Sequence, residues 1–246
     1  MRGWVTLIPA FLLLAASLGP ARAAEGDPYA EDRAIMVTII AAHARSVGRA
    51  ALDPRESPEV MAAMGRAMRH EFVPDRLRDI AYADRPLPIG HGQTISQPYI
   101  VALMTHLLRI EPGDVVLEVG TGSGYQAAIL AELDVRVRTI EIIPELHEEA
   151  TKRLVRLGYG NVETRAGDGY YGWPDAAPFD GIVVTAAAGH VPPPLVQQLN
   201  PGGRMVIPVG DRFSVQHLVL VQKETDGRVF TRQLLPVRFV PLTGQH

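Results

Sequence analysis

The sequence predicts an α/β protein built on a mostly parallel, doubly wound sheet. From residue 114 onward, short apolar runs rich in β-branched residues alternate with amphipathic helical patterns. Parallel strands need helical crossovers, which are right-handed and cover both faces of the sheet. The chain of 246 residues is 47% hydrophobic and 21% charged, so it can bury a sizeable core and is not a disordered protein. The first strand also ends in a glycine-rich turn that opens a helix.

Residues 1–23 have the pattern of a secretory signal peptide. Arg2 precedes an apolar stretch at 7–18, and Ala21 and Ala23 are small residues suited to a cleavage site before Ala24. A membrane-spanning helix needs about 20 apolar residues, so the stretch is short for one. We therefore expect a mature protein that begins at Ala24 and works in the periplasm or outside the cell. An uncleaved anchor and a cytoplasmic protein with an N-terminal helix are the alternatives.

A small helical N-terminal region is expected over 24–83. Helical periodicity covers 30–48 and 57–69, and the second helix begins with Ser57 as N-cap, Pro58 and Glu59. The Gly- and Pro-rich residues 84–98 predict a loop, which opens the main domain at 84–246. A helix is expected next, over 99–108.

Six strands and a returning edge strand are expected in the main domain. The strands are predicted at 114–120, 135–142, within 161–169, and at 180–188, 204–210 and 216–224, with helices at 123–133, 144–157 and 191–199. The turn at 225–227 sends the last segment, 228–242, back as an antiparallel C-terminal strand of a hairpin.

The strongest local motif is the turn that contains Glu118, Gly120, Gly122 and Gly124. Glycines let the backbone approach a ligand, and the following helix offers free N–H groups in the crevice of a doubly wound sheet. Tyr125 stands where a dinucleotide-binding motif has its third glycine. The pattern favours a ligand with an amino-acid group, with Glu118 orienting its positive charge. A tight turn without a ligand is the alternative.

Two further acids follow the next two strands. Glu141 ends the second strand, where a carboxylate can accept both hydroxyls of a ribose. Asp168, between Gly167 and Gly169, follows the third strand and could hold an adenine amino group. Each acid alone could be an exposed strand end or a common turn residue. Their convergence with the glycine turn at the carboxyl ends of three successive strands favours a binding site.

These motifs resemble the class I S-adenosylmethionine-dependent methyltransferases, which have a Rossmann-like fold. Four further segments narrow the resemblance: RHEFVP at 69–74, LPIGHGQTISQPY at 87–99, PGGR at 201–204 and VRFVPL at 237–242. Together they look like the protein-L-isoaspartate O-methyltransferase family over residues 30–243. The loop at 87–99 is the specific motif, whereas PGGR and the glycine turn occur in many methyltransferases.

The resemblance implies a protein-repair reaction. Such an enzyme methylates the free α-carboxylate of L-isoaspartyl residues in aged proteins and releases S-adenosyl-L-homocysteine. It implies Ser96 as the catalytic residue, with Thr94, Ile95 and Val240 also contacting the substrate. The cofactor would be held by Gly169 and Tyr99 together with Glu118, Gly120, Gly122, Gly124, Glu141 and Asp168. A Ser96 hydroxyl that serves only the loop backbone is the structural alternative.

Three other functions compete with this interpretation. A methyltransferase of nucleic acid or of a small molecule is one, although residues 184–189 lack the amino-methylating N/D-P-P-aromatic motif and the net charge is −3. A non-catalytic cofactor-binding module and a nicotinamide oxidoreductase are the others. The sequence has no cysteine and no histidine spacing typical of metal ligands, so no metal is expected. We expect a monomer without nucleic-acid partners and without stable membrane association after signal cleavage.

Overall fold

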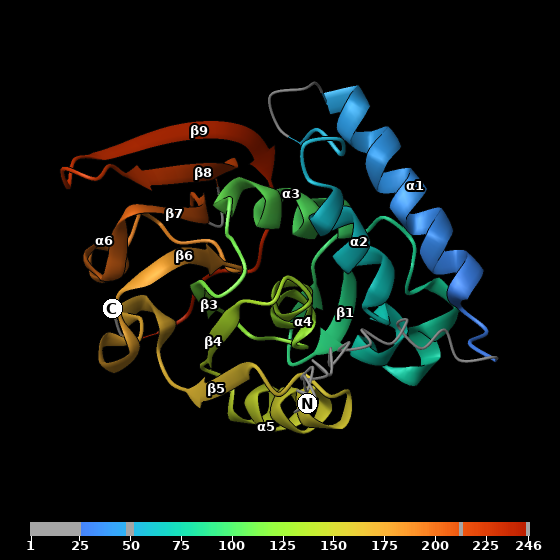
Figure 1. Cartoon of the computed structure of the whole chain (residues 1–246). Coiled ribbons are helices and arrows are strands. Elements are labelled where there is room, and N and C mark those ends of the chain that lie inside the picture. Colours follow the sequence, from blue (N-terminus) through green and yellow to red (C-terminus); the bar gives the residue numbers. More distant parts are fainter. Residues whose placement is uncertain (1–25, 48–51, 212–213, 245–246) are drawn as a thin grey trace, which may run out of the picture.

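The computed structural model describes residues 26–47, 52–211 and 214–244, and the expected leader at 1–23 lies outside them. A seven-stranded sheet with the order β5-β4-β3-β6-β7-β8-β9 forms the centre of the molecule (Figure 1). Its strands are β3 (Val115–Val119), β4 (Arg136–Glu141), β5 (Val162–Ala166), β6 (Phe179–Val184), β7 (Leu199–Val209), β8 (Gln216–Lys223) and β9 (Val229–Val237).

The topology places a crevice between β3 and β6. The chain runs outward from β3 to β4 and β5, then returns to β6 on the other side of β3, and all these neighbours pair in parallel. β8 is antiparallel to both β7 and β9, and β9 is the antiparallel C-terminal edge strand that the sequence predicted. Ligands of open α/β sheets bind where the strand order reverses, at the carboxyl ends of the strands.

Six α-helices are described, and none of the described helices has the length and apolar character of a membrane span. They are α1 (Ala30–Val47), α2 (Pro58–Arg66), α3 (Pro98–Leu108), α4 (Tyr125–Ala131), α5 (Pro144–Arg156) and α6 (Pro193–Gln198). Short 3-10 turns are η1 (Arg69–Phe72), η2 (Asp75–Ile80), η3 (Gly169–Tyr171) and η4 (Pro174–Ala176). Ser57 precedes α2 as predicted, but its hydroxyl contacts His106 Nδ1 instead of capping the helix.

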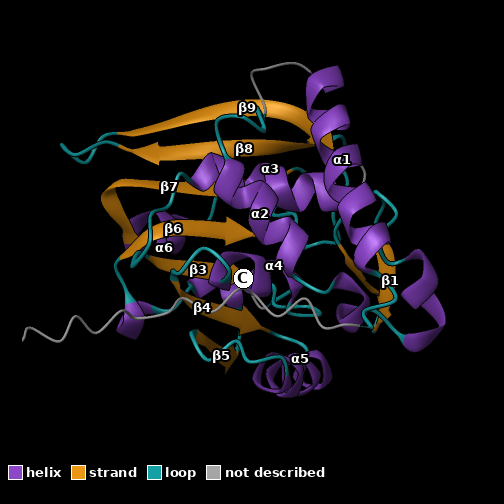
Figure 2. Cartoon of the chain, turned by 45° about the vertical axis from the view of Figure 1, so that its right-hand side comes forward, coloured by secondary structure: helices purple, strands orange, loops and turns teal. Residues whose placement is uncertain are grey.

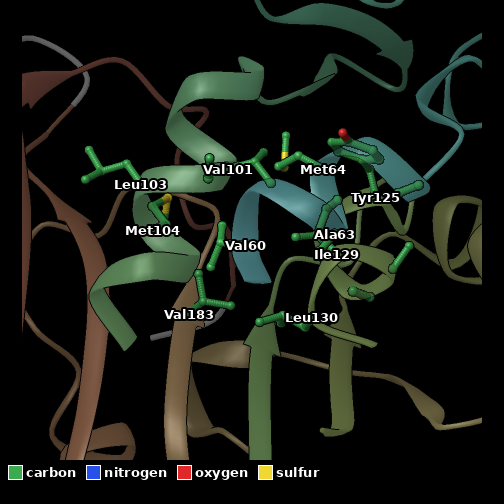
Figure 3. Packing of buried hydrophobic residues seen from close by; sticks show 14 of the residues in the cluster. Val60, Ala63, Met64, Val101, Leu103, Met104, Tyr125, Ile129, Leu130 and Val183 are labelled. Carbon is green, nitrogen blue, oxygen red and sulfur yellow. The ribbon is translucent and has the colours of Figure 1, made fainter. Parts of the chain in front are cut away.

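The core has two layers because successive strand residues point to opposite faces. On one face, helices α2, α3 and α4 pack together, and Val60, Met104, Ile129 and Val183 belong to the buried cluster that they share with β6 (Figure 3). On the other face, a second cluster packs α6 against β6 and β7. Figure 2 shows the strands stacked from β5 to β9 with α1, α2 and α3 gathered beside them.

The segment at 84–98 contains regular structure that the sequence did not predict. Strands β1 (Leu87–Gly90) and β2 (Gln93–Ile95) form an antiparallel hairpin. His91 and Gly92 at its tip both have positive φ, the geometry of a tight hairpin turn. Leu87, Ile89 and Ile95 are buried, so the short apolar alternation around the glycines was the signal for this hairpin.

Candidate functional site

Two adjoining clefts open at the carboxyl ends of β3, β4 and β6. The first, here called the glycine cleft, has a volume of about 60 Å³ and is lined by residues of the glycine turn, of β4 and of the C-terminal segment. The second, the loop cleft, has a volume of about 440 Å³ and lies between the hairpin loop and residues 236–240. Thr94, Thr185 and Val240 line both clefts, so the clefts meet at these three residues.

The glycine turn lies directly after β3. Gly120, Gly122 and Gly124 all have positive φ, at 95°, 53° and 89°. A Cβ atom on Gly120 would stand 2.5 Å from Thr185 Oγ1, closer than real Cβ contacts come. Gly120 and Gly122 line the glycine cleft, whereas Gly124 is the N-cap of α4 and packs against Leu154. The structure thus brings two of the three glycines to the cleft wall.

Glu141 joins β4 to the glycine turn. One carboxylate oxygen accepts a hydrogen bond from Gly122 N at 2.8 Å, and the other accepts one from Ile143 N at 2.9 Å. The side chain lines the glycine cleft although the residue is only 5% exposed. A carboxylate has about four acceptor sites, so it can still accept hydroxyl donors from a ligand. The structure thus places this carboxylate in the wall of the glycine cleft.

Glu118 lies beneath the cleft rather than in its wall. It is completely buried, and its Oε2 accepts a hydrogen bond from Thr139 Oγ1 at 2.5 Å. Its Oε1 is buried and has no hydrogen-bond partner among the described residues. Burial raises the pKa of Glu118 to about 8, and the nearby Glu141 charge acts in the same direction. At neutral pH a substantial fraction of this carboxyl is therefore protonated.

The chain after β5 contributes the backbone of a turn to the glycine cleft, and the Asp168 side chain is not part of the lining. Asp168 accepts a hydrogen bond from Tyr170 N at 3.0 Å and caps η3. Gly169 lines the glycine cleft and packs so closely on Val119 that an added Cβ would overlap the Val119 side chain. Gly169 therefore forms part of the wall, while Asp168 does not line it.

The loop cleft contains Ser96 at the end of β2. The Ser96 carbonyl accepts a hydrogen bond from Arg69 Nη2 at 2.7 Å, whereas its hydroxyl bonds to no described residue. The described residues therefore show no hydrogen bond from this hydroxyl to the loop backbone, which was the structural alternative to a catalytic role. Thr94 lines both clefts, but Ile95 is 4% exposed and points into the core opposite Leu87.

The last residues close the clefts from the other side. Ala187 N donates to Val240 O at 2.8 Å, and Leu242 N donates to Ala187 O at 2.7 Å. This short bridge holds Val240 in the wall shared by both clefts. The expected substrate residue Val240 and the loop residue Ser96 thus face one cavity.

Tyr99 is not brought to either cleft. It is 1% exposed, and its ring stacks on His43 with centroids 4.0 Å apart. The geometry corrects the expectation that Tyr99 touches the cofactor.

Thr185 lines both clefts, but the sequence did not identify it as a site residue, although it directly follows β6. Its hydroxyl donates to Val119 O and Gly120 O, and its side chain faces Gly120 where the clefts meet. The signal that could have identified Thr185 is its place near the carboxyl end of β6, the strand next to β3 in the sheet.

The fold and the acid-bearing strand ends define a class I methyltransferase with a Rossmann-like fold. One solved structure, a protein-L-isoaspartate O-methyltransferase, matches with a TM-score of 0.74 at 29% identity, over 86% of this chain and 66% of that one. Another, a β-aspartate methyltransferase (PCMT) from Plasmodium falciparum in complex with S-adenosyl-L-homocysteine, matches with a TM-score of 0.70 at 25% identity. It covers 85% of this chain and 98% of that one.

Sequence comparisons identify the particular family. The model for protein-L-isoaspartate (D-aspartate) O-methyltransferases matches residues 52–246. Protein-L-isoaspartate O-methyltransferase 2 of Syntrophobacter fumaroxidans is 62% identical over 96% of this chain and 95% of the relative. Protein-L-isoaspartate O-methyltransferase 1 of Cupriavidus necator is 62% identical over 91% and 86%. The chain belongs to the protein-L-isoaspartate O-methyltransferase family.

Proposed function

We propose that this protein transfers the methyl group of S-adenosyl-L-methionine to the free α-carboxylate of L-isoaspartyl residues in proteins and peptides. Membership of the family supports the reaction. The observation that carries it to this structure is the junction of the two clefts at Thr94, Thr185 and Val240. A donor in one cleft and an acceptor in the other can meet there. The methyl ester that results would cyclise to a succinimide and hydrolyse in part to normal aspartate.

The glycine cleft has the groups expected to hold the cofactor. Gly120 and Gly122 present backbone without side chains, and Glu141 presents a carboxylate with acceptor capacity left for ribose hydroxyls. Gly169 also lines this cleft, next to the turn that Asp168 caps. Bound there, S-adenosylmethionine supplies a methyl group on a cationic sulfur. Glu118 supports this cleft from below and does not reach its surface.

The loop cleft has the tasks of binding the acceptor, orienting it and excluding water. A carboxylate with a pKa near 4 is already ionised at neutral pH, so the reaction needs no general base. Ser96 lines this cleft with a hydroxyl that bonds to no described residue, so it can donate to an acceptor carboxylate. Such alignment lowers the activation barrier by several kcal/mol, with an upper limit of about 7–11 kcal/mol.

A peptide-methylation assay tests the proposal. The wild-type protein should methylate a peptide with one L-isoaspartyl residue and leave the same peptide with normal aspartate unmodified. Ser96→Ala should lower kcat on the isoaspartyl peptide by about tenfold or more, the effect of losing a hydrogen bond to a charged group. Its affinity for S-adenosylhomocysteine should stay close to wild type. An inactive wild-type protein would contradict the function, and a fully active Ser96→Ala variant would contradict the role of Ser96.

We also propose that the protein is exported. The support is the signal pattern in residues 1–23, with a mature chain that begins at Ala24. Long-lived envelope proteins accumulate isoaspartate and would be its substrates. N-terminal sequencing of the native protein and separation of periplasm from cytosol test this. A native protein that retains Met1 and fractionates with the cytosol would contradict export and leave the catalytic proposal untouched.

A further inference from the structure

Helix α1 reaches the loop that carries Ser96, although α1 precedes the residues that the family model matches. It packs against α2 and α3 along the outer side of the molecule (Figure 1). From its last turns, His43 Nδ1 lies 2.8 Å from Asp84 Oδ2, and the His43 ring stacks on Tyr99 at 4.0 Å and 13°. Because an ionised carboxylate only accepts, the imidazole N–H is the donor.

Asp84 accepts three hydrogen bonds from two distant parts of the chain. Besides His43, Gln97 Nε2 donates to its Oδ2 at 3.0 Å, and Tyr99 N donates to its Oδ1 at 2.9 Å. The Asp84 side chain is 11% exposed, so these donors replace most of its contact with water. Two of the three donors come from residues within three positions after Ser96, and Gln97 itself lines the loop cleft.

We propose that His43 is a positioning residue of the acceptor site. Through Asp84 it fixes Gln97 and the start of α3, and thereby the backbone that presents Ser96. The inference rests on the proposed function and deepens it, because it makes α1 part of the catalytic architecture. Arg69 holds the Ser96 carbonyl from the opposite side. Without the imidazole, the largely buried carboxylate lacks one of its donors and can turn toward water.

A purely structural role for His43 is the alternative, in which the residue only attaches α1 to α3. The two roles differ in what they change. A loss of attachment lowers stability and affects both clefts together. A loss of positioning affects acceptor turnover and the order of residues 97–99, while the glycine cleft keeps its affinity.

Four variants separate these roles. His43→Ala removes the donor, and His43→Gln restores a side-chain N–H. Asp84→Asn keeps the acceptor for Tyr99 N and removes the charge. Arg45→Ala is the matched control, because Arg45 is exposed on the same helix and the described structure gives its side chain no partner. The readouts are kcat and KM for the isoaspartyl peptide, Kd for S-adenosylhomocysteine, and hydrogen exchange of the Tyr99 amide.

We expect His43→Ala and Asp84→Asn to lower kcat on the isoaspartyl peptide by about tenfold, since small misplacements of reacting groups cost at least that much. The Kd should change less than twofold, and His43→Gln should recover most of the turnover. The Tyr99 amide should exchange faster in His43→Ala than in Arg45→Ala. Unchanged kcat in His43→Ala, or a Kd that weakens by the same factor as kcat falls, would overturn the inference.

The exchange measurement needs no substrate, so it tests the link from His43 to the loop even if the protein proves inactive on the peptide. An inactive wild type would count against the proposed function. A Tyr99 amide that stays equally protected in His43→Ala would count against the inference, whatever the wild-type activity.

Discussion

At the scale of single residues, Glu141 combines two tasks. The sequence predicted a ribose-binding acid, and the structure adds that the same carboxylate fastens Gly122 and Ile143 through their N–H groups. Glu141→Ala should therefore weaken S-adenosylhomocysteine binding by about 1.5–3 kcal/mol, roughly 10- to 100-fold, the range for hydrogen bonds to a charged group. Titration calorimetry measures the change.

The control for this prediction is Glu141→Gln, which keeps the side-chain shape and one acceptor oxygen. It should fall between wild type and Glu141→Ala in affinity. Melting curves show whether either variant is folded at the temperature of the titration. An unchanged Kd in Glu141→Ala would remove Glu141 from the binding site.

Because the pKa of Glu118 is raised, we expect an unusual dependence of the protein's stability on pH. Its folded pKa of about 8 lies above the ordinary carboxyl value of 4.5, so between these pH values the folded state binds more protons than the unfolded state. Stability contributed by Glu118 is then present below about pH 4.5 and is lost as pH rises through 8. Glu118→Gln is neutral at every pH and should lack this loss.

The measurement is the melting temperature of wild type minus that of Glu118→Gln at several pH values. The difference should become more negative from pH 5 to pH 8. Burial lowers the pKa of His70 and His106, which gives the opposite slope, but both proteins share these histidines. A difference that is constant across this range would show that Glu118 titrates normally.

At the scale of elements, the contact between β3 and η3 shapes the glycine cleft. Gly169 has no room for a Cβ because Val119 Cγ1 occupies the space, and its φ is not positive. Gly169→Ala should therefore destabilise the protein by about 1–3 kcal/mol through overpacking. The double variant Gly169→Ala with Val119→Ala should recover part of this loss, because the obstructing methyl groups are removed. Denaturant unfolding of the two single variants and the double variant gives the coupling energy, and simple additivity would contradict the steric explanation.

Elements differed in how well the sequence predicted them. The strands β3 and β6 are mostly buried and rich in β-branched residues, which gives a strong signal, whereas β4 begins with the exposed Arg136 and is buried from Thr139 onward. The helices followed their apolar spacing and prolines. The hairpin of β1 and β2 was predicted as loop, because five of the fifteen residues at 84–98 are glycine or proline. Strand β7 begins at Leu199, before the expected Arg204, since Leu199 already pairs with Phe179 across a register shift.

At the scale of the whole molecule, the sequence indicated where in the sheet the candidate site lies, but not which contacts each of its residues makes. Acids and glycines at strand ends converge because the sheet is parallel, which explains why Gly120, Gly122, Glu141 and Gly169 share one cleft. Tyr99 and Ile95 sit next to site residues in sequence, yet helix and strand geometry turn both into the core. Thr185 and the support from His43 depend on contacts between distant segments, which a single sequence does not reveal.

A truncation tests the contribution of the C-terminal segment to the complete site. A chain that ends after Val237 keeps every strand of the sheet but lacks Val240 and its bridge to Ala187. It should retain cooperative unfolding and native circular dichroism while losing methylation of the isoaspartyl peptide. Methylation at the wild-type rate by this truncated chain would exclude Val240 and its neighbours from the acceptor site.

The bridge between Ala187 and residues 240–242 also has a consequence for when activity begins. Protein synthesis proceeds from the N-terminus, and a domain can start folding before its last residues have left the ribosome. A nascent chain could assemble the glycine turn and most of the sheet, but the wall shared by both clefts would still be missing. We therefore expect methylation to begin only after residues 240–242 have joined the fold and completed this wall.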